Sequence, residues 1–407
     1  MSVNLVKIAA RTAAAGAAVA LGLASAPAAL AVPSPAIVQV PCNSAALAND
    51  IASATSGETL NLSVPCVYVL TTALPDITTD LTITGGGQAT LQRSLALNTP
   101  DFSILAVNTD VNVVINNVNF RNGNSGSGAF LRKTSPAIVP ASASGSGGAI
   151  DNESGNVTVN GGVFTGNTAG NSGGAIYNDG VLSVTHATFT GNSAAFGGAI
   201  ESDNEAAVAD STFNTNTSSS EGGGFYSDGD ATVTRSTFHS NSSEDGGGVF
   251  NDGNMTLTAD TFLTNQATDN EGGGFYNGSD ATVTGGSFIG NTATGFGGGM
   301  SGEDETTVNG TSFSANSAPN GGAIYNDDHT TVNFVTLSQN KAELGGGIYN
   351  DDVSNVNSSK ILHNTASDGG GGIFNDDETV NLNGSSVVNV NTPDNCEPLN
   401  TITGCAN

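Results

Sequence analysis

The sequence predicts an all-β fold: a single-stranded, right-handed parallel β-helix, or solenoid, of about 12–14 coils with an N-terminal capping helix. Three observations predict it. A Gly-Gly-(Ala/Gly)-apolar string recurs every 24–26 residues, and a Phe-x-x-Asn string keeps the same interval. Between them lies a short segment with period-two alternation, such as Thr282-Val283-Thr284, flanked by turn residues such as Asn251-Asp252-Gly253.

Ten consecutive copies of the first string define the repeats. Their apolar residues are Ile150, Ile176, Ile200, Phe225, Val249, Phe275, Met300, Ile324, Ile348 and Ile373. The Asn of the second string falls at Asn167, Asn192, Asn216, Asn241, Asn265, Asn291 and Asn316, and in weaker copies at Asn340, Asn364 and Asn391. One unit cannot bury a core alone, but stacked units align their apolar residues at about 4.8 Å per coil. The handedness rule for parallel crossovers predicts a right-handed coil.

Each repeated residue type has an expected role. The Asn should point inward at a corner and form a stacked ladder of amides that satisfies corner backbone groups. The paired glycines should allow bends where a Cβ would clash or where φ is positive. The Phe should supply most of the buried area in each coil.

Five regions follow one another along the chain. Residues 1–31 have the pattern of a secretory signal peptide, because Lys7 and Arg11 precede an apolar run that ends in Ala29-Leu30-Ala31. We expect a cap and the first coils over 32–100, and an irregular coil with a Ser/Gly-rich inserted loop over 101–146. Repeats of about 25 residues should fill 147–391, and a Cys-containing tail 392–407. The sequence therefore predicts a secreted, extracellular protein that does not span a membrane.

The N-terminal cap is expected to contain a small amphipathic helix. Over residues 44–54, Leu47, Ile51 and Ala54 share one helical face, and Asn43 or Ser44 precedes them as an N-cap. A solenoid needs its open ends covered, so this helix would cover the first coil.

The four cysteines predict two local disulfides. Cysteines of an exported chain form disulfides more often than metal sites. A stack of about 14 coils would be on the order of 65 Å long, whereas a disulfide requires Cα atoms within about 7 Å. The expected pairs are therefore Cys42 with Cys66 and Cys396 with Cys405, one at each end of the stack.

Charge excludes one class of partner. The chain has 37 acidic residues against 9 Lys and Arg, for a net charge of -28. Nucleic-acid binding needs clustered basic residues, so we expect no nucleic-acid partner. The sequence leaves the oligomeric state open.

The two alternating strings resemble a known repeat. Gly-Gly-Ala-Ile at 147–150, 173–176, 197–200 and 321–324, alternating with Phe-x-x-Asn, is similar to the repeat of chlamydial polymorphic outer membrane proteins and of secreted bacterial right-handed β-helix proteins. The resemblance covers about residues 147–391. It implies a surface-displayed β-helix that acts in adhesion.

An aromatic stripe is the candidate binding surface. The position after the apolar anchor also holds Asp151, Glu201 and Ser301, so we infer that it points outward and is exposed. A glycan or a partner protein could bind such a stripe, although stacked aromatics also stabilise neighbouring strands without a ligand. The stripe contains Tyr177, Tyr226, Phe250, Tyr276, Tyr325, Tyr349 and Phe374.

Turn carboxylates are the candidate calcium ligands. We expect no cofactor other than calcium, which would bridge acids that line up along the stack. Turn preference alone also explains Asp at these positions. The residues are Asp179, Asp203, Asp228, Asp252, Asp327, Asp351 and Asp376.

A polysaccharide lyase or hydrolase is the alternative to a binding protein. Such an enzyme needs acids that hold calcium beside an Arg or Lys base, and the best candidate is Arg235 with Asp228 and Asp230. The histidines should be surface residues without metal-ligand spacing; they are His186, His239, His329 and His363. The leading hypothesis is a secreted, non-enzymatic solenoid with a long surface for adhesion or for binding a cell-surface protein or glycan.

Overall fold

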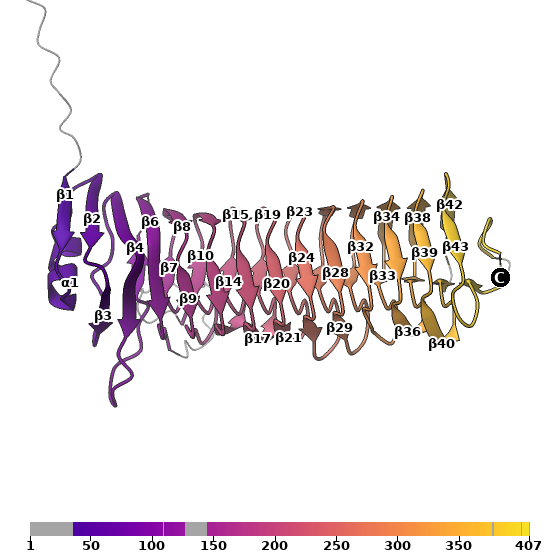
Figure 1. Ribbon diagram of the computed structural model, residues 1–407, viewed down its shortest axis with the longest axis horizontal. Coiled ribbons are helices and arrows are strands. Elements are labelled where there is room, and N and C mark those ends of the chain that lie inside the picture. The colour runs from indigo at the N-terminus through magenta and orange to yellow at the C-terminus, as the bar shows by residue number, and fades with distance from the viewer. Residues whose placement is uncertain (1–35, 109, 127–144, 377, 400, 407) are drawn as a thin grey trace, which may run out of the picture. The chain divides into compact units, whose positions relative to one another are not determined.

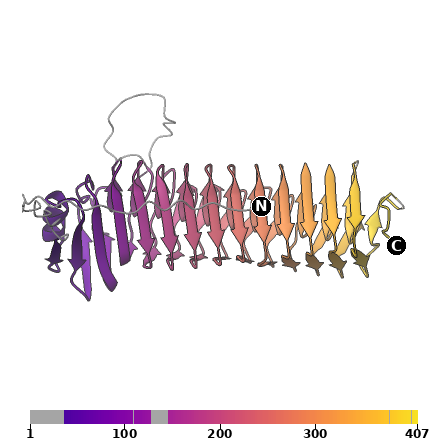
Figure 2. The same cartoon turned by 90° about the horizontal axis from the view of Figure 1, so that it is seen from above.

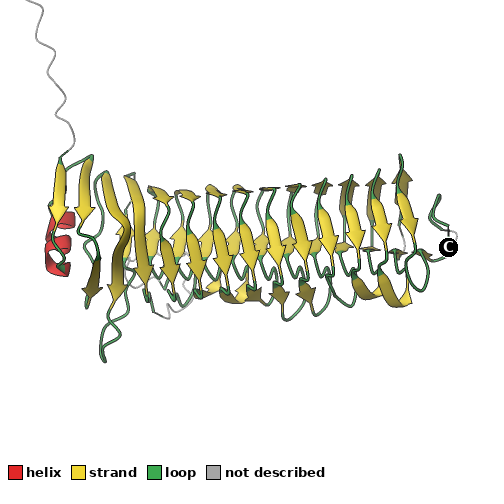
Figure 3. Ribbon diagram, in the orientation of Figure 1, coloured by secondary structure: helices red, strands yellow, loops and turns green. Residues whose placement is uncertain are grey.

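The computed structural model describes residues 36–108, 110–126, 145–376, 378–399 and 401–406. The expected signal peptide and most of the expected Ser/Gly-rich loop lie outside these residues. The described chain is an all-β parallel solenoid whose coils stack along one axis from β1 to β43 (Figures 1 and 2). Apart from one short helix, the described chain consists of strands and the loops that join them (Figure 3).

Two neighbouring columns of strands make up the largest sheet of the described chain, which has 25 strands. The first column contains β1 (Ile37–Val40), β2 (Glu58–Leu62), β4 (Leu81–Arg93), β6 (Asn112–Arg121), β8 (Asn156–Asn160), β11 (Val181–Thr185), β15 (Ala206–Ala209), β19 (Ala231–Thr234), β23 (Met255–Thr258), β27 (Ala281–Thr284), β31 (Thr306–Asn309), β34 (His329–Asn333), β38 (Val353–Asn357) and β42 (Val380–Asn383). The long strands β4 and β6 also pair with strands of the second column. The other members of that column are β3 (Cys66–Leu70), β9 (Val163–Thr165), β12 (Thr188–Thr190), β16 (Thr212–Asn214), β20 (Thr237–His239), β24 (Thr261–Leu263), β28 (Ser287–Ile289), β32 (Ser312–Ser314), β35 (Thr336–Ser338), β39 (Lys360–Leu362) and β43 (Val387–Asn389).

A second sheet of 12 strands starts at each Gly-Gly corner in the repeats that the structure describes. It contains β5 (Leu105–Val107), β7 (Ile150–Asn152), β10 (Ile176–Asn178), β14 (Ile200–Ser202), β18 (Phe225–Ser227), β22 (Val249–Asn251), β26 (Phe275–Asn277), β30 (Met300–Gly302), β33 (Ile324–Asn326), β37 (Ile348–Asn350), β41 (Ile373–Asn375) and β44 (Cys396–Glu397). Short strands before the corners form two small sheets: β13 (Ser193–Phe196), β17 (Thr217–Glu221), β21 (Ser242–Ser243), β25 (Gln266–Ala267) and β29 (Thr292–Ala293), then β36 (Lys341–Leu344) and β40 (Thr365–Gly369).

The coils pair in parallel, with equivalent residues of successive repeats opposite each other. Ile176 lies opposite Ile200, and Ile200 lies opposite Phe225. The same register stacks the phenylalanine rings inside the solenoid, with centroids 4.4–5.1 Å apart. These fully or almost fully buried rings are Phe120, Phe164, Phe189, Phe213, Phe238, Phe262, Phe288 and Phe313.

The expected corner geometry of the paired glycines is confirmed at Gly197 and Gly198. Gly197 has φ of 58°, in the left-handed region that favours glycine. A Cβ on Gly198 would lie 2.2 Å from the carbonyl oxygen of Gly223 in the next coil. The corner can therefore stack at this spacing only without a side chain.

Helix α1 (Ser44–Ala52) begins at the expected N-cap. The Asn43 side chain accepts hydrogen bonds from the backbone N–H groups of Ala45 and Ala46 at 2.9 and 3.0 Å. Leu47 and Ile51 are buried in the main core, and α1 contacts β1 and β3. The helix is present as expected, while its capping role stays a prediction.

Both expected disulfides are confirmed. Cys42 pairs with Cys66 at a Cα separation of 5.7 Å, and Cys396 pairs with Cys405 at 6.3 Å. Among the described helices, none has the length and apolar character needed to cross a membrane.

The predicted ladder of buried asparagine amides is confirmed, and Asn265 shows its bonding. The Oδ1 atom of Asn265 accepts from both the backbone N–H and the Nδ2 of Asn241, each at 3.0 Å. Its Nδ2 donates to the Phe238 carbonyl at 2.9 Å and to Oδ1 of Asn291 at 3.0 Å. Each amide thus joins its own coil to the coils before and after it.

Replacing one ladder amide should destabilise the solenoid strongly. Asn265→Ala removes the side-chain acceptor of the Asn241 backbone N–H, one of the two acceptors of Asn241 Nδ2 and a donor to the Phe238 carbonyl, and each lost bond costs about 1–3 kcal/mol. We expect a loss of about 3 kcal/mol or more in the free energy of unfolding, measured by urea denaturation followed by circular dichroism. The matched control is Asn381→Ala, which removes an exposed amide contact to Asn355 and should change stability by less than about 0.5 kcal/mol. Equal effects of the two substitutions would contradict the role of the ladder.

Candidate functional site

The outward positions of the 12-stranded sheet form one continuous row, here called the aromatic row. Tyr226, Phe250 and Tyr276 stack with ring centroids 5.3 and 4.4 Å apart. Tyr325, Tyr349 and Phe374 stack at 5.3 and 5.2 Å. In order, the row contains Asp151, Tyr177, Glu201, Tyr226, Phe250, Tyr276, Ser301, Tyr325, Tyr349 and Phe374.

The expectation that this row is an exposed stripe is wrong. Phe250 and Tyr325 are only 7 % exposed, and the other five aromatic members are half-buried. At two corners, the segment before the Gly-Gly pair packs against the row: the Phe196 ring meets Tyr226 edge-on with centroids 5.8 Å apart, and the ring centroid of Phe296 lies 4.6 Å from that of Tyr325. The row points away from the main core, but residues of the segments before the corners, such as Phe196 and Phe296, pack over it.

The turn carboxylates border the aromatic row, and three of them bind its tyrosines. The hydroxyl of Tyr177 donates to Asp203 at 2.7 Å, and that of Tyr349 donates to Asp376 at 2.8 Å. Tyr325 donates to Asp327 at 3.1 Å. These acids therefore have a structural role that the sequence did not reveal.

Strand register places the expected calcium residues in line along the stack. Asp179 lies one position after Asn178, which pairs with Ser202, so Asp179 is opposite Asp203. The same argument places Asp203 opposite Asp228 and Asp228 opposite Asp252. The second run is Asp327, Asp351 and Asp376, and Gly278 and Glu303 separate it from the first. Alignment is confirmed, while calcium binding to the row stays a prediction.

Buried asparagines hold these turns in shape. Asn178 donates from Nδ2 to the Gly180 carbonyl at 3.1 Å, and Asn350 donates to the Asp352 carbonyl at 2.6 Å. Each of these asparagines is fully buried at the end of a strand of the 12-stranded sheet. The repeated Asn-Asp sequence thus combines a buried anchor with an outward carboxylate.

Several acidic side chains are partly buried, and burial raises the pKa of their carboxyl groups. Burial raises the pKa of Glu271 to about 7, although a hydrogen bond from the Ser301 hydroxyl at 2.6 Å opposes the shift. Burial, reinforced by Asp245, likewise raises the pKa of Glu221 to about 7. On another part of the coil, burial raises the pKa of Asp260 to about 7, against two backbone hydrogen bonds from Ser236 and Thr258.

The residues of the lyase alternative are not brought together. Asp228 and Asp230 precede strand β19, whereas Arg235 follows it, so the strand length separates them. Arg235 instead forms a two-point salt bridge with Asp210, with Nε and Nη2 each 2.8 Å from a carboxylate oxygen. The side chain of Arg235 is 59 % exposed.

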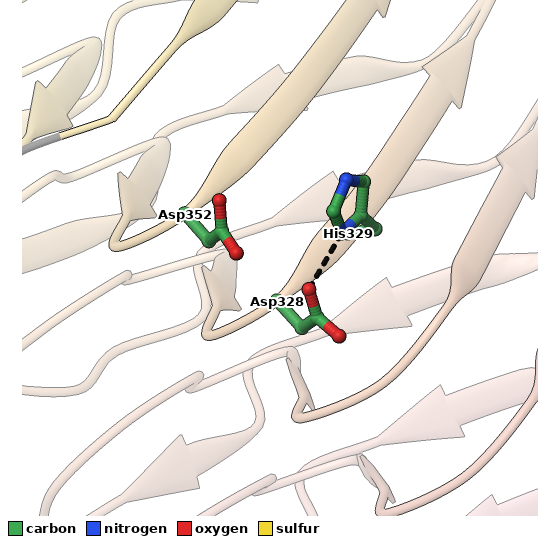
Figure 4. A group of neighbouring side chains, drawn as sticks. All are labelled: Asp328, His329 and Asp352. Atoms are coloured by element: carbon green, nitrogen blue, oxygen red, sulfur yellow. Dashed lines mark hydrogen bonds and ion pairs between the residues drawn. The ribbon is translucent and has the colours of Figure 1, made fainter.

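One group with metal-ligand spacing was missed by the sequence reasoning. Ligand atoms of Asp328, His329 and Asp352 lie within 4.8 Å of one another, and Figure 4 shows these side chains together. Asp328 accepts from Nδ1 of His329 at 2.5 Å, which raises the pKa of the imidazole. His329 is exposed as expected, but the expectation that it lacks such spacing is wrong. The signal that could have found it is the interval of 24 residues between Asp328 and Asp352, which equals one coil.

An acidic groove lies on a different face, over the first strand column. Its volume is about 720 Å³, and it crosses five coils from β15 to β31. The side chain of Asn254 donates to Asp230 at 2.7 Å inside it. Its acidic lining residues are Glu205, Asp230, Asp280 and Glu305, and the threonines Thr232, Thr256, Thr282 and Thr307 lie beside them.

The fold and the repeated corner define a class: a parallel β-solenoid built from coils of one sequence type. The family model of the chlamydial polymorphic membrane protein repeat matches residues 161–179 and 310–327. Each match runs from a Phe-x-x-Asn corner to an Asn-Asp turn, so the coils carry repeats of this type, as expected. Searches of curated proteins and of solved structures found no match to the chain.

Stability should fall as pH rises through the range in which Glu271 titrates. Its pKa is about 7 in the folded chain against an ordinary value of 4.5, so the folded state binds the proton more tightly. The stabilisation is therefore complete below about pH 4.5 and is lost as pH rises through about 7. We expect Glu271→Gln to flatten the decline of melting temperature over this window, with the exposed Glu205→Gln as control. An unchanged slope in the Glu271 variant would exclude this residue as a source of the pH dependence.

Proposed function

We propose that this protein is an exported, non-enzymatic β-solenoid that binds a cell-surface partner through the aromatic row and its bordering carboxylates. The pattern of residues 1–31 and the two disulfides support export to an oxidising compartment. The matched repeat is described as that of a polymorphic membrane protein, which supports a place at the cell surface. In this proposal the coil is right-handed, and α1 covers its first turn.

The observation that carries the proposal is the combination of half-buried rings and carboxylates along one face. The rings of Tyr226 and Tyr276 are fixed by stacking on Phe250, so they lose little conformational freedom when a ligand binds. Exposed Asp228 and Asp252 lie beside them and offer hydrogen-bond acceptors. Aromatic surface with polar acceptors at its border suits the apolar faces and hydroxyl groups of a sugar.

Charge decides which glycans fit this face. The chain carries a net charge of -28, and acids line both the turns and the groove. A polyanionic glycan would be repelled, so we propose a neutral or amino-substituted glycan as the partner. The same repulsion disfavours the acidic polysaccharides on which a lyase acts.

Removing carboxylates beside the rings should weaken glycan binding without disturbing the fold. We expect Asp228→Asn with Asp252→Asn to lower the affinity about tenfold, because two charged acceptors are lost. The measurement is binding to an array of neutral and amino-substituted oligosaccharides. Asp230→Asn with Asp280→Asn is the matched control, since it removes two exposed acids from the groove instead. Equal binding by both double variants and the parent protein would contradict the proposal.

A further inference from the structure

Glu201 is a buried carboxyl group that interrupts the aromatic row. Its strand β14 pairs with β10 and β18, which places Tyr177 and Tyr226 on either side of it. Glu201 is only 6 % exposed, and its Oε2 atom has no hydrogen-bond partner in the described structure. A buried, unpaired carboxylate oxygen is costly, so something must compensate it.

No basic side chain of the surrounding coils can provide this compensation. Residues 145–234 contain neither Lys nor Arg. Burial raises the pKa of Glu201 well above the ordinary value, the neighbouring acids Asp203 and Asp228 raise it further, and a hydrogen bond from the neutral Ser172 hydroxyl opposes the shift without supplying a charge. The compensating positive charge is therefore either a proton or a cation from solution.

A second carboxyl group, that of Asp203, lies next to Glu201 and is held in a fixed orientation. Asp203 follows Glu201 by two residues, in the turn after β14, and its carboxyl group lies within hydrogen-bonding reach of the Glu201 carboxyl group. The hydroxyl of Tyr177 donates to Oδ2 of Asp203 at 2.7 Å, which fixes this carboxyl group beside Glu201. Two carboxyl groups, one buried and one held by a phenol, thus lie close together where Glu201 interrupts the aromatic row.

We propose that Glu201 and Asp203 form a calcium site, with Glu201 Oε2 as the buried ligand. Calcium accepts carboxylate oxygens of variable geometry and completes its coordination with water, so two protein carboxylates at a half-buried position suit it. The site does not depend on the proposed glycan partner. It differs from a simple row of turn aspartates because, among the described coils, this one adds a buried glutamate with an unpartnered carboxylate oxygen.

Terbium luminescence gives a direct test, because Tb³⁺ replaces Ca²⁺ and the chain contains no Trp. Excitation of tyrosine should sensitise bound Tb³⁺ at this site, which Tyr177 and Tyr226 flank. We expect Ca²⁺ to displace the most tightly bound Tb³⁺. Glu201→Gln should weaken that binding about tenfold or more. Glu221→Gln, a half-buried acid on the covering segment, is the matched control and should keep it.

Thermal unfolding provides a second measurement that does not use terbium. The parent protein should gain melting temperature in Ca²⁺ relative to NaCl of equal ionic strength, because the ion binds only the folded coil. Glu201→Gln should reduce this gain, yet unfold at a higher temperature than the parent when calcium is chelated, since a buried carboxylate is removed. A Ca²⁺ response and Tb³⁺ affinity equal to those of the parent in Glu201→Gln would overturn the site. Absence of any tight Tb³⁺ step in the parent would overturn it too, and would leave a proton as the compensating charge.

Discussion

The parallel hydrogen bonding of each coil to the next determines where every other group in this protein lies. Because equivalent residues pair directly, a residue type that recurs in the sequence becomes a column in space, about 4.8 Å from copy to copy. The phenylalanine stack and the asparagine ladder are columns inside the solenoid, and the aromatic row and turn acids are columns outside it. Columns of neutral groups stabilise themselves by stacking or by hydrogen bonds. A column of carboxylates cannot, and this difference makes the acids the chemically informative part of the surface.

The protein resolves the repulsion among its acids in several local ways. Tyrosine hydroxyls bind Asp203 and Asp376, and the Ser301 hydroxyl binds Glu271. Elsewhere the acid column is interrupted, as where Gly278 follows Asp252 in the stack. Where a carboxyl group is deeply buried and one of its oxygens has no partner, as at Oε2 of Glu201, a proton or an external cation has to compensate the negative charge. The binding properties of this surface thus depend on which acids are already neutralised within the chain.

The repeat interval predicted the solenoid, the amide ladder and the local disulfides, because each of them depends on which residues of successive coils stack on one another. It also predicted that the aromatic residues point away from the core. It did not predict their burial, since the covering residues such as Phe196 come from the segments before the Gly-Gly corners, whose path over the sheet the interval does not determine. For the same reason the sequence did not predict the burial of Glu201, which the repeat pattern showed only as a charged residue at an outward position. The grouping of Asp328, His329 and Asp352 was missed because His329 does not recur at that position in the other repeats.

The asparagine ladder has a direction, which bears on how such a protein changes over evolutionary time. From Asn167 through Asn364, every ladder amide donates from Nδ2 to Oδ1 of the ladder amide in the following coil, and the series ends at Asn391, which donates to Asn395. A coil therefore presents the same acceptor to the coil before it and the same donor to the coil after it. Duplication or deletion of one whole repeat would leave both junctions chemically unchanged. The length of the solenoid, and with it the number of binding positions along its face, can thus vary in steps of one repeat without redesign of the core.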